Sequence, residues 1–377
     1  MLSTAADRFG NVSDVVEQIQ SLFDRAAVQE EGPVQSALIE EAVRLADSIQ
    51  DEWLQFFTRI SYVSAAFHAG EADKMMVALG WCVAAAERTP EKYPADVLIG
   101  GLEEAAAYVA SFPDISRKQI EQLLDQLEQK TREAGLGLRS LYRDRCFNAL
   151  WLGDHDHARE LYAAMAQHRD HKWQGDSLRL FQTDYHIQLG EPKQAYRVVA
   201  PILSRSDSSG MYIWAASFAL RPLIDLQKWD EASEVHRRAY PLIQRNPKYI
   251  ELVGHHLQYL AASGDLARGL TLLEKHLGQA IEASSIRSGF EFMLAGWALF
   301  RRVIVESTLQ VSIRLPEQCP LASDTPPYSV PRLAAWLESC VRQREQQFNT
   351  RNGNMYFSRI VADRLAQVDE NTHRSRD

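Results

Sequence analysis

Cysteine is scarce in this chain of 377 residues, and the few cysteines present are scattered. Only four occur, and no two of them form a CxxC pair. A disulfide framework or a structural zinc site needs cysteines at characteristic spacings, so we expect neither. The pattern fits reduced thiols in a cytoplasmic protein better. The four residues are Cys82, Cys146, Cys319 and Cys340.

Long apolar runs are also lacking. The most continuous one, Gly289 to Phe300, contains Glu291 and is followed by Arg301 and Arg302. It is well short of the ~18–20 residues that a membrane-spanning helix needs, so we interpret it as a buried helix and expect no membrane span. The first residues show no cationic stretch followed by an apolar one, and we expect no secretory signal.

An excess of positive charge is absent as well. The chain has 41 basic and 50 acidic side chains, a formal net charge of -9, which argues against nucleic acid as the main partner. Its 46% hydrophobic content argues against wholesale disorder. The first 60 residues hold 11 acidic and 4 basic side chains. This bias fits a solvated helical face or an acidic surface that meets a basic partner.

What the sequence does contain is a repeated turn. Segments of the type Leu-Gly-Asp or Leu-Gly-Glu recur, each flanked by about 15 residues with apolar positions at helical spacing. Four anchor residues follow one another at intervals of 37 positions. An earlier match at Gly70 lies far enough before Gly153 to leave room for one slightly longer unit. The segment Phe112-Pro-Asp-Ile-Ser lies in this gap and divides it into roughly equal parts. The four anchors are Gly153, Gly190, Gln227 and Gly264.

Each anchor is predicted to join two helices into a hairpin. Glycine enters left-handed backbone conformations at little cost, which permits a tight turn. Acidic residues just after the anchors can cap the second helix. Five residues after each anchor a small side chain allows the paired helices to approach closely. These small residues are Ala158, Ala195, Ala232 and Gly269.

The turn and second helix of these units resemble the tetratricopeptide repeat (TPR). Its pattern is Gly-Asp-x-x-x-Ala followed four positions later by an aromatic or apolar residue, and Ala158 with Tyr162 and Ala195 with Val199 fit it. The resemblance covers roughly residues 54 to 280, in units longer than the ~34 residues of the family. It implies an all-α fold: a right-handed α-solenoid of TPR-like helical hairpins with additional helices at both ends.

We divide the chain into three parts. Residues 1–52 are predicted to form two N-terminal helices, as a cap or a further degenerate hairpin. Residues 53–283 hold the TPR-like repeats, and residues 284–377 form a C-terminal helical region with a proline-rich loop at 316–331. Apolar residues alternate with polar ones over 309–315, which fits a strand or a helix. We expect a helix there, because its surroundings are helical.

The resemblance also implies a binding surface, since TPR proteins usually hold peptides on the concave face lined by their first helices. We therefore expect a non-enzymatic scaffold or adaptor for a protein or peptide, with no metal, cofactor or catalytic residue. Mixed aromatic, arginine and polar side chains suit such a surface, although a residue such as Phe147 more often packs between helices. Spacing from the anchors gives the candidate residues Arg143, Phe147, Asp184, Trp214, Arg221 and Gln258.

Two other functions remain open. One is a regulatory receptor that senses a ligand or peptide and changes the curvature of its superhelix. The other is an enzyme with a site in the C-terminal region around Glu291, Arg301, Arg302 and Arg351. No activated nucleophile with a base accompanies those residues, and the common catalytic motifs are absent.

Histidines form two groups that deserve separate interpretations. Asp154-His155-Asp156-His157, with His168 and His171 nearby, has a spacing that can bind transition metals. We interpret it as an ordinary turn between helices, because an intervening helix of about 15 Å would separate its two ends. The adjacent His255 and His256 face different sides of a helix, and we expect both to be hydrogen-bonded core residues.

Overall fold

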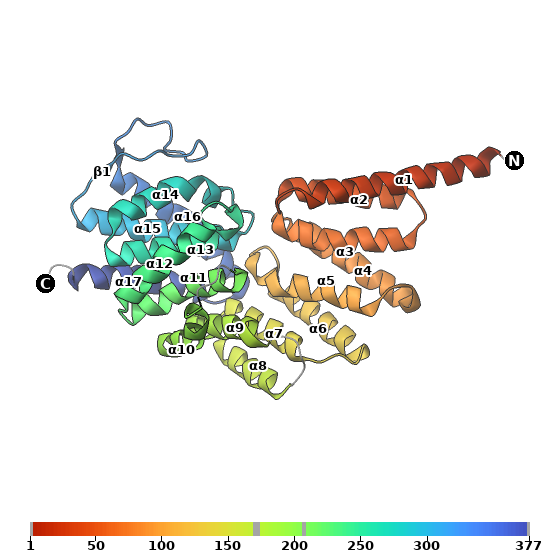
Figure 1. The fold of residues 1–377 in the computed structure, drawn as a ribbon, viewed down its shortest axis with the longest axis horizontal. Helices are drawn as coiled ribbons and strands as arrows, with labels where there is room; N and C mark the ends of the chain where they lie inside the picture. Colours follow the sequence, from red (N-terminus) through yellow and green to blue (C-terminus); the bar gives the residue numbers. More distant parts are fainter. Residues whose placement is uncertain (1–2, 169–173, 206–208, 375–377) are drawn as a thin grey trace. The chain divides into compact units, whose positions relative to one another are not determined.

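The computed structural model describes residues 3–168, 174–205 and 209–374, with side chains described between residues 13 and 371 of these ranges. Within them the chain forms seventeen α-helices, three short 3-10 helices and one pair of two-residue strands (Figure 1). The predicted all-α fold is therefore confirmed. In the same ranges, no helix is long and apolar enough to cross a bilayer.

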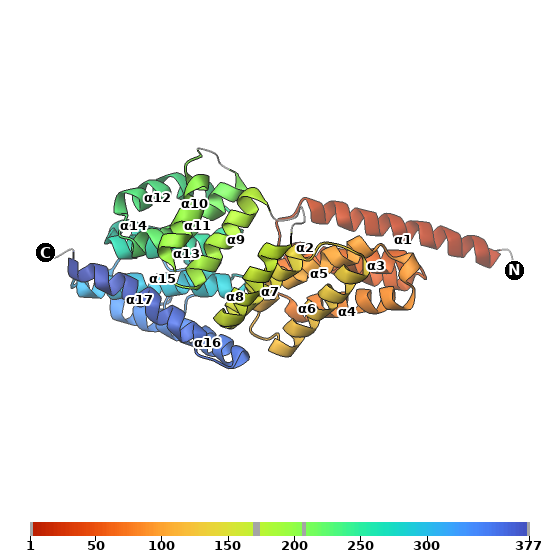
Figure 2. The same cartoon turned by 90° about the horizontal axis from the view of Figure 1, so that it is seen from below.

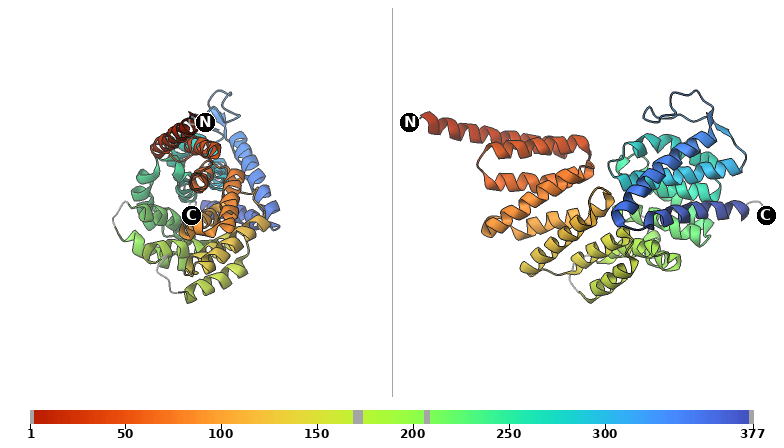
Figure 3. Two further views of the ribbon diagram at one scale, coloured as in Figure 1. Left: turned by 90° about the vertical axis from the view of Figure 1, so that its right-hand side faces the viewer. Right: turned by 180° about the vertical axis from the view of Figure 1, so that it is seen from behind.

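The first of two compact units comprises Met1–Trp151 with Asp156–Asp170. Its helices pack against their neighbours in chain order, as the red-to-yellow part of Figure 3 (right) shows. An apolar stripe of α1, with Val15, Ile19 and Leu22, packs on α2 and confirms the N-terminal helix pair. The elements are α1 (Ser3–Ala27), α2 (Pro33–Ser48), α3 (Glu52–His68), α4 (Ala72–Arg88), η1 (Pro90–Lys92), α5 (Ala95–Tyr108), η2 (Val109–Ser111), α6 (Arg117–Glu133), α7 (Arg139–Leu152) and α8 (His155–Gln167).

The second unit comprises Leu152–His155 with His171–Asp377. Its long buried helix α15 contains the apolar run at 289–300, as predicted. The pair α16–α17 lies along one side of this unit (Figure 2), where α17 packs against α13, α15 and α16. The elements are α9 (Gly175–Gln188), α10 (Pro192–Leu203), α11 (Gly210–Asp225), α12 (Trp229–Ile243), η3 (Pro247–Tyr249), α13 (Ile250–Ser263), α14 (Leu266–Ile281), α15 (Ile286–Val305), β1 (Gln310–Val311), β2 (Tyr328–Ser329), α16 (Val330–Asn352) and α17 (Tyr356–Arg374).

The predicted turns are confirmed at every anchor. Gly153, Gly190 and Gly264 have φ of 77°, 71° and 81°, and Gln227 adopts the same left-handed conformation with φ of 57°. At Gly190 the next amide reaches back to the carbonyl of His186 at 2.9 Å, and the amide after Gln227 does the same to Leu223 at 2.9 Å. These bonds satisfy carbonyls that the end of a helix leaves without partners. Each anchor thus ends one helix and lets the next begin.

The small residues five positions after the anchors are buried between helices, as predicted. Ala158, Ala195 and Ala232 are wholly inaccessible. At Gly269 a β-carbon would lie 2.7 Å from the side chain of Leu299, so only glycine fits without movement. The earlier pair, α3 with α4, turns at Gly70 with φ of 77°. The segment at 112–116 separates α5 from α6, and Ser116 caps α6.

The C-terminal region departs from prediction in one segment. Residues 309–315 do not form a helix: Gln310 and Val311 form β1, which pairs antiparallel with Tyr328 and Ser329 of β2. The two compact units also divide the chain inside the predicted repeat region, near residues 151–171. The predicted limits of the repeat region, after residues 52 and 283, remain predictions.

Candidate partner-binding surface

Four of the six candidate residues occupy equivalent places in successive hairpins. Phe147, Asp184, Arg221 and Gln258 are 37 residues apart and lie on α7, α9, α11 and α13, the first helix of each pair. Phe147 belongs to the first unit, and the other three belong to the second.

In the first unit, Arg143 and Phe147 are partly buried on α7. The Arg143 side chain is 14% exposed and forms an ion pair with the fully buried Asp144. Asn148, one residue after Phe147, donates to the carbonyl of Ala106 at 2.7 Å and attaches α7 to α5. This surface therefore offers only the edges of Arg143 and Phe147 to a partner.

In the second unit, Asp184 and Gln258 are buried, with 6% and 2% of their surfaces exposed. Asp184 accepts a hydrogen bond from Gln188 Nε2 at 3.1 Å. Gln258 Nε2 donates to the backbone carbonyl of Arg364 in α17 at 2.7 Å. Gln258 on α13 is thus covered by α17 rather than open to solvent.

Arg221 and Trp214, both on α11, are the partly exposed candidates of this unit. The positive charge of Arg221 favours the ionised forms of Asp184 and Glu291, although burial outweighs it at Asp184 and raises the pKa of that carboxyl. The Trp214 ring packs against aromatic side chains, with its centre 5.6 Å from that of Phe218 and 6.5 Å from that of Tyr249.

Two buried ion pairs complete the surroundings of Asp184 and Arg221. Arg287 of α15 meets Glu251 of α13 at 2.8 Å. Arg364 of α17 meets Glu291 of α15 at 2.8 Å, with side chains only 3% and 5% exposed. We call the whole group the buried polar cluster, and it consists of Asp184, Gln188, Arg221, Glu251, Gln258, Arg287, Glu291, Tyr356 and Arg364.

Burial and charge pairing compete within this cluster. Burial disfavours the Glu291 carboxylate, but Arg364, Arg221 and Arg287 outweigh it and lower its pKa to about 2. For Asp184 and Glu251 burial prevails over the nearby Arg287, so both pKa values are raised. The paired arginines therefore favour the ionised form of Glu291, which meets Arg364 at 2.8 Å.

Sequence inspection missed Arg287 and Arg364 and gave Glu291 only as a possible catalytic group. The available signal was a set of charged residues within otherwise apolar helical stripes, because an isolated charge is costly to bury. Glu291 lies among Phe290, Phe292 and Met293 of α15, and such a position requires a cationic partner. Which helix supplies that partner is not readable from local sequence.

The other residues of the enzyme hypothesis are engaged in different places. Arg301 pairs with Asp369 of α17 at 2.7 Å, and Arg302 pairs with Glu306 at 3.3 Å. The Arg351 guanidinium lies 5.6 Å from the ring centre of Phe348. Each of the three arginines thus makes its contact at a different place in the second unit.

The histidines lie in two different settings. His255 and His256 are buried on α13, as predicted: His255 Nδ1 is 3.2 Å from the carbonyl of Ser217, and His256 Nδ1 is 3.0 Å from His236 Nδ1. His155 begins α8 and its ring meets Tyr356 edge-on at 5.0 Å. In the part of the chain that the structure describes, no three His, Cys, Asp or Glu side chains gather to hold a metal ion, and His171 lies outside that part.

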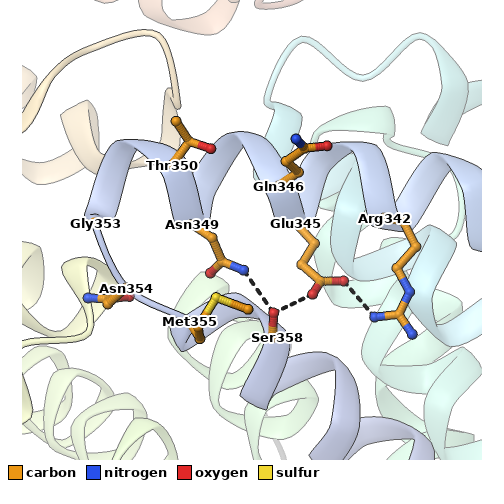
Figure 4. Close-up of a pocket in the computed structure, with 9 residues that line it drawn as sticks. All are labelled: Arg342, Glu345, Gln346, Asn349, Thr350, Gly353, Asn354, Met355 and Ser358. Atoms are coloured by element: carbon orange, nitrogen blue, oxygen red, sulfur yellow. Dashed lines mark hydrogen bonds and ion pairs between the residues drawn. The ribbon is translucent and has the colours of Figure 1, made fainter.

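A pocket of about 480 Å³ opens at the turn between α16 and α17. Figure 4 shows Arg342, Glu345 and Asn349 extending from α16 beside Ser358, near the start of α17. Asn349 Nδ2 donates to the Ser358 hydroxyl at 2.9 Å, and that hydroxyl donates to Glu345, which Arg342 also contacts at 2.8 Å. Met355 on the rim is 65% exposed. None of the six sequence-predicted residues lines this pocket.

Comparison with known proteins adds no relative to this description. No protein-family model, curated protein or solved structure matches the chain.

Proposed function

We propose that this chain is a non-enzymatic, TPR-like helical-repeat protein that binds a protein or peptide partner on the faces of its first helices. The main support is the repetition: four hairpins 37 residues apart share a left-handed anchor and a small residue between their helices. Stacked hairpins of this kind present equivalent positions side by side to a ligand. We extend the proposal to a right-handed α-solenoid with additional helices at both ends.

The partner is proposed to be a protein or peptide rather than nucleic acid, because the net charge is -9. A cytoplasmic location is part of the proposal. It is supported by four free thiols, of which Cys82, Cys146 and Cys319 are buried. The role fits a scaffold or adaptor whose pre-ordered helices reduce the entropy lost on association.

Trp214 is the most suitable candidate for a direct test. It is partly exposed, and aromatic side chains contribute strongly to interface energies. Arg221 is a poor probe by comparison: a charge reversal there would place a third carboxylate beside Asp184 and Glu291 and would disturb folding.

The test places a photo-crosslinking amino acid at position 214 of the full chain, in cells that normally contain it. The matched control carries the same group at Leu242, which is 40% exposed on α12, the second helix of its hairpin. We expect a discrete crosslinked partner from position 214 and none from position 242. In a separate experiment without the crosslinking group, we expect the Trp214→Ala chain to bind that partner at least ~10-fold more weakly. Truncating an aromatic side chain at the centre of an interface costs about 2 kcal/mol or more of binding free energy. Equal crosslinking from both positions would refute the first-helix surface.

A further inference from the structure

Helix α17 packs on α13 and α15 of the second unit and reaches the C-terminal ends of α9 and α11. Seen from behind, the blue α16–α17 pair crosses the green and cyan helices of this unit (Figure 3, right). Along its length α17 reaches α9 through Gln188, α11 through Asp225, α13 through Gln258, and α15 through Glu291. One helix therefore contacts the first helix of every hairpin in this unit, and also α15.

The polar contacts of α17 are spaced along one face. The Tyr356 hydroxyl donates to Gln188 Oε1 at 2.6 Å, and Gln188 passes the connection on to Asp184 at 3.1 Å. Two turns later Arg364 forms its buried ion pair with Glu291. Gln367 then donates to Asp225 at 2.6 Å. Tyr356, Arg364 eight residues later and Gln367 three residues after that thus each meet a complementary group on another helix of the unit.

Apolar side chains fill the space between these contacts. Phe357, Ile360, Val361, Leu365 and Val368 are buried. The opposite side of the helix, with Ala362, Asp363 and Glu370, is exposed. This is an amphipathic helix lying in a groove, the mode by which many proteins bind a helical partner.

The chemistry of this contact favours selectivity over strength. Removing two charges from water is costly, so a buried ion pair adds less stability than apolar packing of the same size. The same pair discriminates sharply, because a helix without the arginine would leave Glu291 buried and unpaired.

A short turn whose first residue, Gly353, ends α16 joins that helix to α17. Gly353 has φ of 67°, and the short turn ends where Tyr356 begins α17. Asn349 and Glu345 hold Ser358 beside the pocket of Figure 4, and Asn354 Nδ2 donates to the carbonyl of Leu152 at 2.7 Å. These polar contacts fix the turn between the two helices.

We propose that α17 is a built-in ligand that occupies the partner-binding surface of the second unit. An external partner would displace it with an amphipathic helix bearing a tyrosine, an arginine eight residues later and a glutamine three residues after that. This inference rests on the proposed function, since it names the partner of the same first-helix surface. A tethered occupant has a high effective concentration, so it keeps weaker competitors out.

The test uses the full chain and a fluorescent peptide with the sequence of residues 354–374. The releasing variant carries Tyr356→Ala and Arg364→Ala, which weaken α17 but leave the groove intact. The matched control carries Asp363→Ala and Glu370→Ala on the exposed side of α17. We expect the releasing variant to bind the peptide at least ~10-fold tighter than the wild type and the control do. A peptide with Arg364→Ala should lose that binding.

Either of two results would overturn the inference: a folded releasing variant that binds no better than the wild type, or equal binding of the altered peptide. If the releasing variant does not fold, hydrogen exchange of the wild-type chain decides. The α17 amides should exchange at least ~100-fold faster than those of α13 and α15, because α17 must open alone. Exchange as slow as that of α13 would make α17 a permanent part of the core. Because no natural partner is used, a negative result here leaves the Trp214 crosslinking test standing.

Discussion

Among individual residues, Gln227 stands out because it adopts a conformation suited to glycine. The three other anchors in the 37-residue series are glycines, whereas Gln227 reaches φ of 57° with a full side chain. A left-handed conformation costs an ordinary residue ~1–2 kcal/mol, and glycine avoids most of that penalty. The turn therefore forms because the packing of α11 and α12 imposes it.

We predict that Gln227→Gly raises the free energy of unfolding by ~0.5–1 kcal/mol. Glycine removes the steric cost of the left-handed conformation, but it also makes the unfolded chain more flexible, which cancels part of the gain. Urea unfolding followed by circular dichroism measures it. Gln244→Gly is the matched control, because Gln244 has an ordinary φ of -62° at the end of α12 and should lose stability on the same change. A gain in both variants, or in neither, would contradict the strain argument.

Among the helices, α17 is attached to α15 by a buried ion pair between Arg364 and Glu291. Breaking a buried ion pair by removing one member costs about 3–5 kcal/mol, whereas replacing both members with apolar residues of similar volume is often neutral. The pair between Glu291 and Arg364 meets this description, with both side chains almost fully buried.

We predict that Arg364→Met lowers the free energy of unfolding by about 3–5 kcal/mol and that adding Glu291→Leu restores most of the loss. Thermal and urea unfolding of the three chains measure this. Asp369→Asn removes the exposed pair with Arg301, 41% exposed on each side, and should change stability by less than about 1 kcal/mol. If the double variant is as unstable as the single one, Glu291 is not the main reason why Arg364 is needed.

Local patterns were sufficient to predict the helix pairs. A glycine or its substitute followed by a capping residue acts within a few positions, and so does the small residue at Ala195 or Ala232. The segment 309–315 was wrongly expected to be a helix, because its strand pairing comes from residues 328–329 and Pro316 disfavours helix at the residue before it.

The covering of the candidate surface was not predictable from local sequence. Gln258 and Arg364 are 106 positions apart, and no periodicity links them. Asp184 and Gln258 were expected to line a surface and are instead buried, Gln258 against α17. Their role in binding a partner, like that of Arg143, Phe147, Trp214 and Arg221, remains a prediction.

For the molecule as a whole, buried histidines set the response to acid. Burial lowers the pKa of His236 to about 4 and that of His255 to about 3, and it also lowers those of His256 and His276. In the unfolded chain these side chains bind a proton near pH 6.5. Below that pH the unfolded state binds more protons than the folded state, so stability falls as the pH decreases.

We predict a continuous loss of stability from about pH 6.5 to pH 4, at up to ~1.4 kcal/mol per pH unit for each buried histidine. His236→Gln should make this slope shallower. His157→Gln, on a side chain that is 59% exposed, should leave it unchanged. The raised pKa values of Asp184 and Glu251 act in the opposite direction, but they are common to all three chains and cancel in the comparison. Parallel curves for the wild type and His236→Gln would contradict the prediction.

The position of α17 in the chain also bears on biosynthesis. A ribosome completes α9, α11, α13 and α15 before it makes α17, so the groove that holds Glu291 and Asp184 is uncovered while translation continues. Water can solvate the carboxylates, amides and guanidinium groups of the groove during this interval, whereas apolar side chains at the same positions would favour aggregation. The carboxylates of Glu291 and Asp184 thus keep their hydration until α17 is made, and Glu291 loses its water only when it gains Arg364 as a partner.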